Sequence, residues 1–143
     1  MEGLSKKEEQ NLIEKALEAR EKAYCPYSGF AVGAALMTQE GKIYTGCNVE
    51  NSSFGATNCA ERTAIFKAVS EGERFFRGIA ITGRPQNENA EEFFSDYAYP
   101  CGVCRQVMSE FGGEDFQILV ARTKEDYRCF TLKELLPMAF GTK

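Results

Sequence analysis

Histidine and tryptophan are both missing from this sequence of 143 residues. Without histidine the chain cannot form a Ser-His-Asp triad, a Cys-His dyad, the HExxH site of zinc proteases or a zinc finger that uses histidine. A metal site must therefore take its ligands from cysteine, aspartate or glutamate. A general acid or base must be a carboxylate, a lysine, a tyrosine or a cysteine.

An excess of positive charge and a long apolar run are missing as well. The 17 basic and 21 acidic residues give a net charge of -4 and a pI near 5.0. This balance disfavours proteins that follow the phosphates of a nucleic-acid polymer, but it leaves a single nucleoside open as a ligand. No stretch approaches the roughly 20 apolar residues of a membrane-spanning helix, and the charged N-terminus MEGLSKKEEQ has no apolar signal segment. We therefore expect a cytoplasmic protein, with neither a membrane nor a nucleic-acid polymer as partner.

The composition is that of one globular domain. Hydrophobic residues make up 43% of the chain and charged residues 27%. A chain of this length buries roughly 68–70% of its unfolded surface, which is enough for a hydrophobic core. We expect a single domain over residues 1–143, with its six cysteines present as reduced thiols.

The apolar periodicity predicts alternating helices and strands. Ser5 and Glu8 have the capping-box spacing at the start of a helix over residues 5–24, and Thr131 and Glu134 repeat it at the last predicted helix. This order indicates an α/β fold with one mixed sheet covered by helices. The other predicted elements are helices over 59–70, 101–111 and 131–140, strands over 30–37, 42–50, 75–83, 116–122 and 127–132, and an acidic loop over 84–99.

Two short cysteine motifs, CAE at 59–61 and PCGVC at 100–104, stand at the starts of predicted helices. The unpaired N–H groups and the positive dipole end of a helix N-terminus favour the thiolate that a ligating cysteine requires. Three thiolates on two adjacent helices would give Zn²⁺ three protein ligands. The fourth tetrahedral position would stay open, as it does in catalytic zinc sites.

Glu61 follows the first of these cysteines by two residues, within reach of a metal held there. A carboxylate in that place can take a proton from water and pass it to a substrate. Arg62, the next residue, is a candidate to donate a hydrogen bond to a cysteine sulfur.

Each feature also has a simpler interpretation. Asn58 is the predicted N-cap of the helix over 59–70, and its spacing to Glu61 is that of a capping box. The pair of cysteines in CGVC could be a redox dithiol. A closed zinc site is possible too, with Cys25, Cys47 or Cys129 as a fourth ligand. The two motifs together, in this order, favour the catalytic site.

In these residues the chain resembles the zinc-dependent cytidine deaminases, specifically the small, three-cysteine, homotetrameric kind. The resemblance runs in order from about residue 24 to residue 140. It implies a three-layer α/β/α sandwich with a mixed five-stranded sheet. The matching stretches are CPYSGFAVGAAL, GCNVEN, NCAERTAIFKAVSEG, PCGVCRQVMSE and ELLPMAF.

The resemblance also implies a reaction. Cys59, Cys101 and Cys104 would bind one Zn²⁺ per chain. Glu61 would move protons from water to N3 of the pyrimidine and then to the departing amino group. The products would be uridine or 2′-deoxyuridine and ammonia, formed from cytidine or 2′-deoxycytidine in pyrimidine salvage.

Substrate contacts follow from the same resemblance. The GCNVEN segment would recognise the sugar, with Asn48 and Glu50 at the 3′-hydroxyl and Val49 between them. Phe30 would be an aromatic wall for the base, and the backbone at Ala60 would read its polar edge.

Phe140 would reach into the site of a neighbouring subunit, so that a homotetramer shares its active sites. Phe54, among the substrate-binding positions, stands where relatives commonly have tyrosine, and Tyr99 stands where serine is usual. The loop over 84–99 is longer and more acidic than expected.

Two further functions remain open at this stage. One is deamination of another cytosine nucleoside analogue. The other is a thiol redox or structural zinc protein that acts on no nucleoside. Tightly bound zinc would disfavour the redox protein, and an open coordination position would disfavour the structural one.

Overall fold

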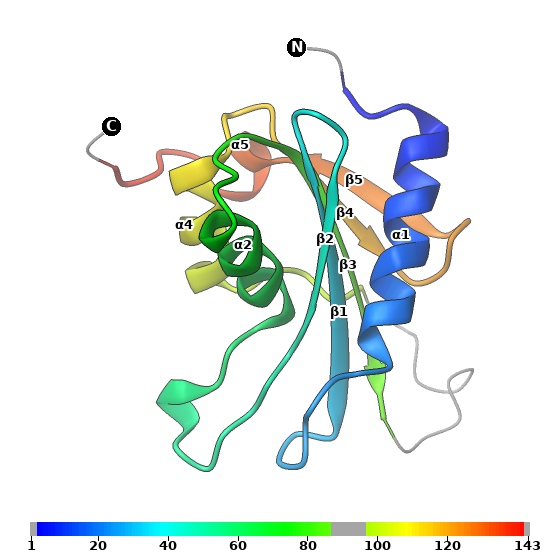
Figure 1. Ribbon diagram of the computed structural model, residues 1–143, viewed down its shortest axis with the longest axis vertical. Helices are drawn as coiled ribbons and strands as arrows, with labels where there is room; N and C mark the ends of the chain where they lie inside the picture. The colour runs from blue at the N-terminus through cyan, green and yellow to red at the C-terminus, as the bar shows by residue number, and fades with distance from the viewer. Residues whose placement is uncertain (1–2, 87–96, 142–143) are drawn as a thin grey trace.

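The computed structural model describes residues 3–86 and 97–141. Five strands form one mixed sheet in the order β2-β1-β3-β4-β5, in which β3 and β4 are parallel and the other neighbours are antiparallel (Figure 1). Their bounds are β1 Phe30–Thr38, β2 Ile43–Cys47, β3 Phe76–Pro85, β4 Gln117–Ala121 and β5 Tyr127–Thr131.

Helices cover both faces of this sheet (Figure 1). One face carries α1 (Lys6–Arg20), which packs its apolar side against β1 and β3. The other face carries α2 (Ala60–Ser70), α4 (Gly102–Phe111) and α5 (Leu132–Leu135), which share a second hydrophobic core with the sheet. The predicted three-layer α/β/α sandwich with a five-stranded mixed sheet is confirmed.

Two glycines let helices approach the sheet closely from opposite faces. A Cβ atom on Gly33 of β1 would lie 2.1 Å from the carbonyl oxygen of Ala16 in α1. A Cβ atom on Gly46 of β2 would lie 2.5 Å from the backbone nitrogen of Ala64 in α2. Because these neighbours are backbone atoms, only glycine permits such packing. The close contact between α2 and β2 at Gly46 fixes where the first turn of α2 lies.

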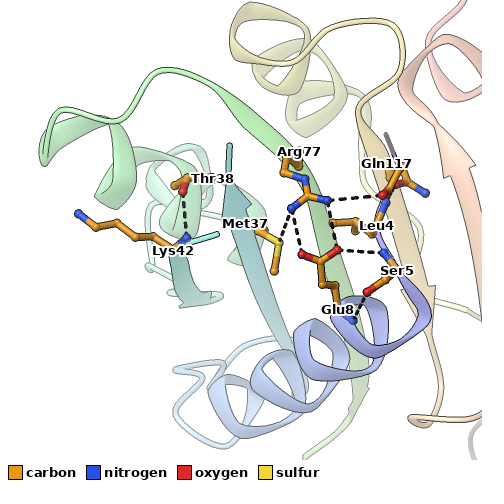
Figure 2. Close-up of polar contacts among 9 residues, drawn as sticks. Leu4, Ser5, Glu8, Met37, Thr38, Lys42, Arg77 and Gln117 are labelled. Atoms are coloured by element: carbon orange, nitrogen blue, oxygen red, sulfur yellow. Dashed lines mark hydrogen bonds and ion pairs between the residues drawn. The ribbon is translucent and has the colours of Figure 1, made fainter. Parts of the chain in front are cut away.

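The predicted capping box at the start of α1 is confirmed, since Ser5 and Glu8 exchange side chain to backbone hydrogen bonds. The Glu8 carboxylate also pairs with the Arg77 guanidinium of β3 at 3.0 Å, and Figure 2 shows the two side chains facing each other. The helix ends at Arg20 and not at residue 24. Tyr24 instead bridges Val49 in extended conformation.

Three other predicted boundaries are wrong in detail. The second strand ends at Cys47, because the chain beyond it leaves the ladder of β1. Asn58 is not the N-cap of α2; Cys59 is, and the Asn58 amide donates to Thr63 instead. The last helix keeps its predicted Thr131 cap but ends at Leu135, well before residue 140.

The predicted loop over 84–99 falls partly outside the described residues, which resume at Tyr97. None of the helices in the described ranges is long and apolar enough to cross a membrane.

Candidate active site and metal centre

The three cysteines of the two motifs come together at the starts of two helices. Cys59 is the N-cap of α2, Cys101 is the N-cap of α4, and Cys104 lies in the first turn of α4. Their sulfur atoms all lie within 4.8 Å of one another, and Sγ of Cys59 is 3.9 Å from Sγ of Cys101. Sulfur atoms bound to one tetrahedral zinc at about 2.3 Å lie about 3.8 Å apart. The donor set and its spacing therefore fit Zn²⁺.

The other three cysteines lie elsewhere. Cys25 contacts the Gln86 side chain, Cys47 the carbonyl of Lys22, and Cys129 the Gln117 amide. Among the described residues, no fourth cysteine joins the cluster. The closed four-cysteine site considered from the sequence is thus absent from the described part of the chain.

Hydrogen bonds divide the charge unevenly within the cluster. The Cys104 thiol and the Arg62 guanidinium both donate hydrogen bonds to the Cys59 sulfur, and Nη2 of Arg62 lies 3.3 Å from it. Together these hydrogen bonds lower the pKa of Cys59 to about 5, although burial of the thiol acts in the opposite direction. Donation to Cys59 and full burial both raise the pKa of Cys104. A thiolate therefore forms first at Cys59, and a bound cation would favour ionisation of the others.

Glu61 lies one residue beyond the first position of α2, with only 5% of its surface exposed. Burial raises the pKa of this carboxyl to about 7, and the nearby Cys59 charge adds to the effect. Its position excludes the capping-box interpretation, because Asn58 lies outside the N-cap and forms no such cap. A carboxyl group of this kind can both accept and donate a proton near neutral pH.

A cleft of about 360 Å³ opens beside the cysteines and Glu61. It collects predicted site residues from four separate segments, namely β1, the stretch after β2 and the starts of α2 and α4. The predicted residues that line it are Phe30, Asn48, Glu50, Cys59, Ala60, Glu61 and Cys101.

Asn48 and Glu50 are held firmly in this cleft. The Asn48 amide bridges the backbone of β1, donating to the carbonyl of Phe30 at 2.8 Å and accepting from the N–H of Val32 at 2.9 Å. The Glu50 carboxylate accepts hydrogen bonds from both the backbone and the hydroxyl of Ser28, which lower the pKa of Glu50. Both polar groups are thus fixed before any ligand arrives.

Three predicted substrate residues do not line this cleft. Val49 is 45% exposed and pairs its backbone with Tyr24 and Asn58. Phe54 lies in a short 3-10 helix, 75% exposed, and lines an adjoining hollow of about 340 Å³ that shares Ser28, Glu50 and Thr57 with the cleft. Phe140 is 77% exposed near the C-terminus and is not among the residues that line the cleft of its own chain.

Sequence reasoning misses several cleft residues. Ser28 belongs to the CPYSG stretch, which in the sequence indicates only the end of a helix. In the structure Ser28 donates a hydrogen bond to the Glu50 carboxylate. Ala98 also lines the cleft, beside β3. The Phe30 ring passes over Gly83 of β3, where a Cβ atom would lie 2.7 Å from Cε2 of that ring and 3.2 Å from the Ala98 methyl. No local sequence pattern reports such long-range neighbours.

Comparisons with known proteins agree with this geometry. The family model for the cytidine and deoxycytidylate deaminase zinc-binding region matches residues 6–120. The cytidine deaminase of Halalkalibacterium halodurans is 47% identical over 134 residues, covering 92% of each chain. That of Sporosarcina psychrophila is 45% identical over 132 residues, covering 92% of this chain and 90% of the relative.

Solved structures show the same fold. The crystal structure of cytidine deaminase from Burkholderia pseudomallei superposes with a TM-score of 0.81 at 47% identity, covering 91% of this chain and 97% of the other. The cytidine deaminase of Mycobacterium tuberculosis gives 0.75 at 38% identity, covering 92% and 96%. Because the family model covers residues 6–120 and these proteins match the chain in fold and over most of its length, the chain belongs to the cytidine and deoxycytidylate deaminase family.

Proposed function

We propose that this chain is a zinc-dependent hydrolytic deaminase that converts cytidine and 2′-deoxycytidine to uridine and 2′-deoxyuridine, with release of ammonia, in pyrimidine salvage. The observation that carries the proposal is one cleft that holds two clustered sulfur ligands, a buried carboxyl group and two fixed polar side chains. The relatives described above, named cytidine deaminases, supply the substrate class.

Cys59, Cys101 and Cys104 would hold one Zn²⁺ per chain. When bound, this ion supplies Lewis-acid chemistry, which makes water a stronger acid at neutral pH. Arg62 supports the arrangement by donating to the Cys59 sulfur.

Glu61 would carry the protons of the reaction. Its carboxylate takes a proton from water and delivers it to N3 of the pyrimidine as the water oxygen adds to C4. The same carboxyl group then passes the second proton of that water to the amino group. The C4–N bond breaks, ammonia leaves, and the ring is left as a uracil.

The cleft walls would bind the rest of the nucleoside. The Phe30 ring, which lines the cleft, would offer an apolar face to the base, and the backbone of Ala60 would read its polar edge. The Asn48 amide would donate to the oxygen of the sugar 3′-hydroxyl, and the Glu50 carboxylate would accept from its O–H, from the positions that β1 and Ser28 fix. Val49 and Phe54 lie too far toward the surface to line the same cleft, and we assign Phe54 to the adjoining sugar side.

The C-terminal segment supports a shared site in a homotetramer. Phe140 projects from the surface, and Met138 is 99% exposed in the same segment. Large apolar side chains this exposed are typical of contact surfaces. We infer that Phe140 completes the cleft of a neighbouring copy. The six free thiols agree with a cytoplasmic location.

Deamination of another cytosine nucleoside analogue is the second candidate. A blasticidin-S deaminase of Bacillus cereus is 30% identical over 109 residues, below the cytidine deaminases. Phe54 lacks the hydroxyl of a tyrosine and lines the hollow beside the cleft. A preference for a nucleoside analogue over cytidine would therefore arise on this sugar side.

The test follows the ultraviolet absorbance of cytidine, together with ammonia release and zinc content, for the purified protein. We expect the cytidine band to decay with one zinc per chain. Glu61→Gln should retain zinc and lose activity by at least about 10²-fold, because it removes the proton carrier.

Glu18→Gln is the matched control, since it removes the same charge from an exposed site on α1. Its activity should equal that of the wild type. A zinc-loaded wild type that leaves cytidine unchanged but deaminates an analogue would favour the second candidate. A chain that holds no zinc would contradict the proposed function.

A further inference from the structure

Residues 97–100 connect to the metal centre without regular secondary structure. This segment runs directly into Cys101, and two of its residues, Ala98 and Tyr99, line the cleft. The Ala98 methyl lies beside the Phe30 ring over Gly83. Whatever holds this segment therefore sets both a cleft wall and a ligand position.

The Arg128 side chain of β5 contacts both tyrosines of the segment. Its guanidinium carbon lies 4.3 Å from the centre of the Tyr97 ring, in cation–π geometry. Its Nη1 donates to the Tyr99 hydroxyl at 3.2 Å. One exposed arginine thus holds two residues that flank Ala98.

Neighbouring groups complete the attachment to the β4–β5 hairpin. The Tyr97 hydroxyl donates to Asp126 at 2.7 Å, and Asp126 in turn pairs with Arg122 at 3.3 Å. The Tyr99 ring packs against Phe130 with ring centres 5.8 Å apart. The segment therefore rests on side chains of the outermost strand and its turn.

The other end of the segment is fixed from α4. Nε of Arg105 donates to the carbonyl of Pro100 at 2.8 Å, and its Nη1 donates to the carbonyl of Leu135 at 2.9 Å. Asp126 and Phe130 each hold one of the two tyrosines, and the guanidinium carbon of Arg122 lies 5.5 Å from the centre of the Tyr97 ring. Arg128 contacts both tyrosines.

We propose that Arg128 is a positioning residue for the substrate cleft: it fixes Tyr97 and Tyr99, and through them the Ala98 wall against which the base and Phe30 pack. This role rests on the proposed function, because the wall matters only if a nucleoside enters the cleft. Arg128 lies on an exposed face of the edge strand, so the core does not depend on it. Its loss should affect substrate binding more than folding.

The test compares steady-state cytidine kinetics of the zinc-loaded wild type with Arg128→Ala and Arg128→Lys. We expect Arg128→Ala to raise KM about fivefold with kcat within about twofold, because the wall shifts but the reacting groups remain. Arg128→Lys keeps the cation over the Tyr97 ring and should recover most of the affinity. Zinc content and melting temperature should stay near wild type. Arg74→Ala, which removes an exposed arginine that donates to the carbonyls of Val69 and Glu73, is the control.

A second variant tests the route through Tyr99. Tyr99→Phe removes the hydroxyl that Arg128 contacts, so the KM of Arg128→Ala/Tyr99→Phe should rise less than the product of the two single effects. Multiplicative effects would overturn the proposal. So would an unchanged KM for Arg128→Ala, or a joint loss of kcat, zinc and melting temperature that Arg128→Lys does not restore.

Near-ultraviolet circular dichroism separates this proposal from the proposed function. The chain has six tyrosines and no tryptophan, so this signal reports tyrosine packing with little interference. Arg128→Ala should change the spectrum, whereas Arg74→Ala should not. A wild type that fails to convert cytidine would contradict the proposed function, and an unchanged spectrum for Arg128→Ala would contradict the positioning role.

Discussion

The Cys104 thiol and the Arg62 guanidinium together set the charge on Cys59, and Arg62 is the partner from outside the cysteine cluster. Arg62 brings a cation to 3.3 Å from Sγ of Cys59, and this contact helps lower the pKa of that thiol. Three thiolates around one cation would leave excess negative charge, which reduces its power as a Lewis acid. A guanidinium that donates to one sulfur draws off part of that charge.

Arg62→Gln should therefore lower kcat/KM for cytidine by about tenfold near neutral pH, in the range found when the outer partner of a metal ligand is removed. The measurement is kcat/KM together with zinc retention against a competing chelator. Arg62→Lys keeps the positive charge but loses the several N–H donors of the guanidinium, so its kcat/KM should lie between those of Arg62→Gln and the wild type. Activity of Arg62→Gln equal to wild type would contradict this role.

Some functional residues can be predicted from the sequence and others cannot. Cys59 and Glu61 are recognisable because ligand and carboxylate lie two residues apart, and local spacing survives folding. Ser28 and Gly83 are not, because their importance comes from Glu50 and Phe30, which lie far from them in the chain. Long-range pairs of this kind appear only once the strand register is known.

At the scale of elements, the close contact between α2 and β2 places the site. Gly46 allows the first turns of α2 to lie directly on the strand, and that end of the helix carries Cys59 and Glu61. A side chain at Gly46 would meet the backbone nitrogen of Ala64 at 2.5 Å and the carbonyl of Ala60 at 2.7 Å. Backbone atoms cannot rotate away, so the whole helix would have to move.

Gly46→Ala should reduce the free energy of unfolding by about 3 kcal/mol, the upper range for overpacking. It should also weaken zinc binding, because the shift separates Cys59 from the two cysteines of α4. Denaturant unfolding and chelator competition measure the two effects. Gly55→Ala is the control, since a Cβ atom there would meet open space. Wild-type stability for Gly46→Ala would show that the contact is looser than its distances indicate.

Element types were predictable, and so were the ends of α2, α4, β4 and β5 to within one residue, but the end of α1 was not. The capping boxes at Ser5 and Thr131 are local signals, and both are observed. The end of α1 depends on Tyr24, which leaves the helix to pair with Val49. That pairing is a tertiary interaction, and helix periodicity in the sequence carries no information about it.

At the scale of the whole molecule, α1 is fastened to the sheet by a titratable contact. The backbone N–H of Ser5 and the Arg77 guanidinium both donate to the Glu8 carboxylate and hold its pKa below the ordinary value (Figure 2). A folded-state pKa that lies below the unfolded one stabilises the fold above the unfolded pKa. This contribution is lost as the pH falls through the folded-state value.

Glu8→Gln should accordingly lower the free energy of unfolding at pH 7 by about 0.5–1 kcal/mol, as expected for a partly exposed pair. The deficit should shrink as the pH falls below about 4, where the wild-type carboxyl group is protonated too. Urea unfolding across this pH range measures it. Glu18→Gln makes the same charge change at a more exposed pair and should show a smaller effect. A deficit independent of pH would indicate that packing, not charge, joins α1 to β3.

The proposed sharing of sites makes the oligomer itself testable. If each cleft needs its own Glu61 and Phe140 from a neighbour, Glu61→Gln and Phe140→Ala are defective in different parts of the same composite site. Unfolding and refolding the two variants together in equal amounts should then restore activity. Random assembly pairs an intact Glu61 with an intact Phe140 in about a quarter of the sites, and activity should approach that fraction of wild type.

Refolding each variant alone is the control and should restore nothing. If Phe140 served the cleft of its own chain, every chain in the mixture would still carry one defect, and no activity could return. Zinc content and oligomer size of the mixture, measured on the same samples, ensure that a lack of recovery is not a lack of assembly. Recovery would thus establish together that copies associate and that the exposed Phe140 has its place in a partner's cleft.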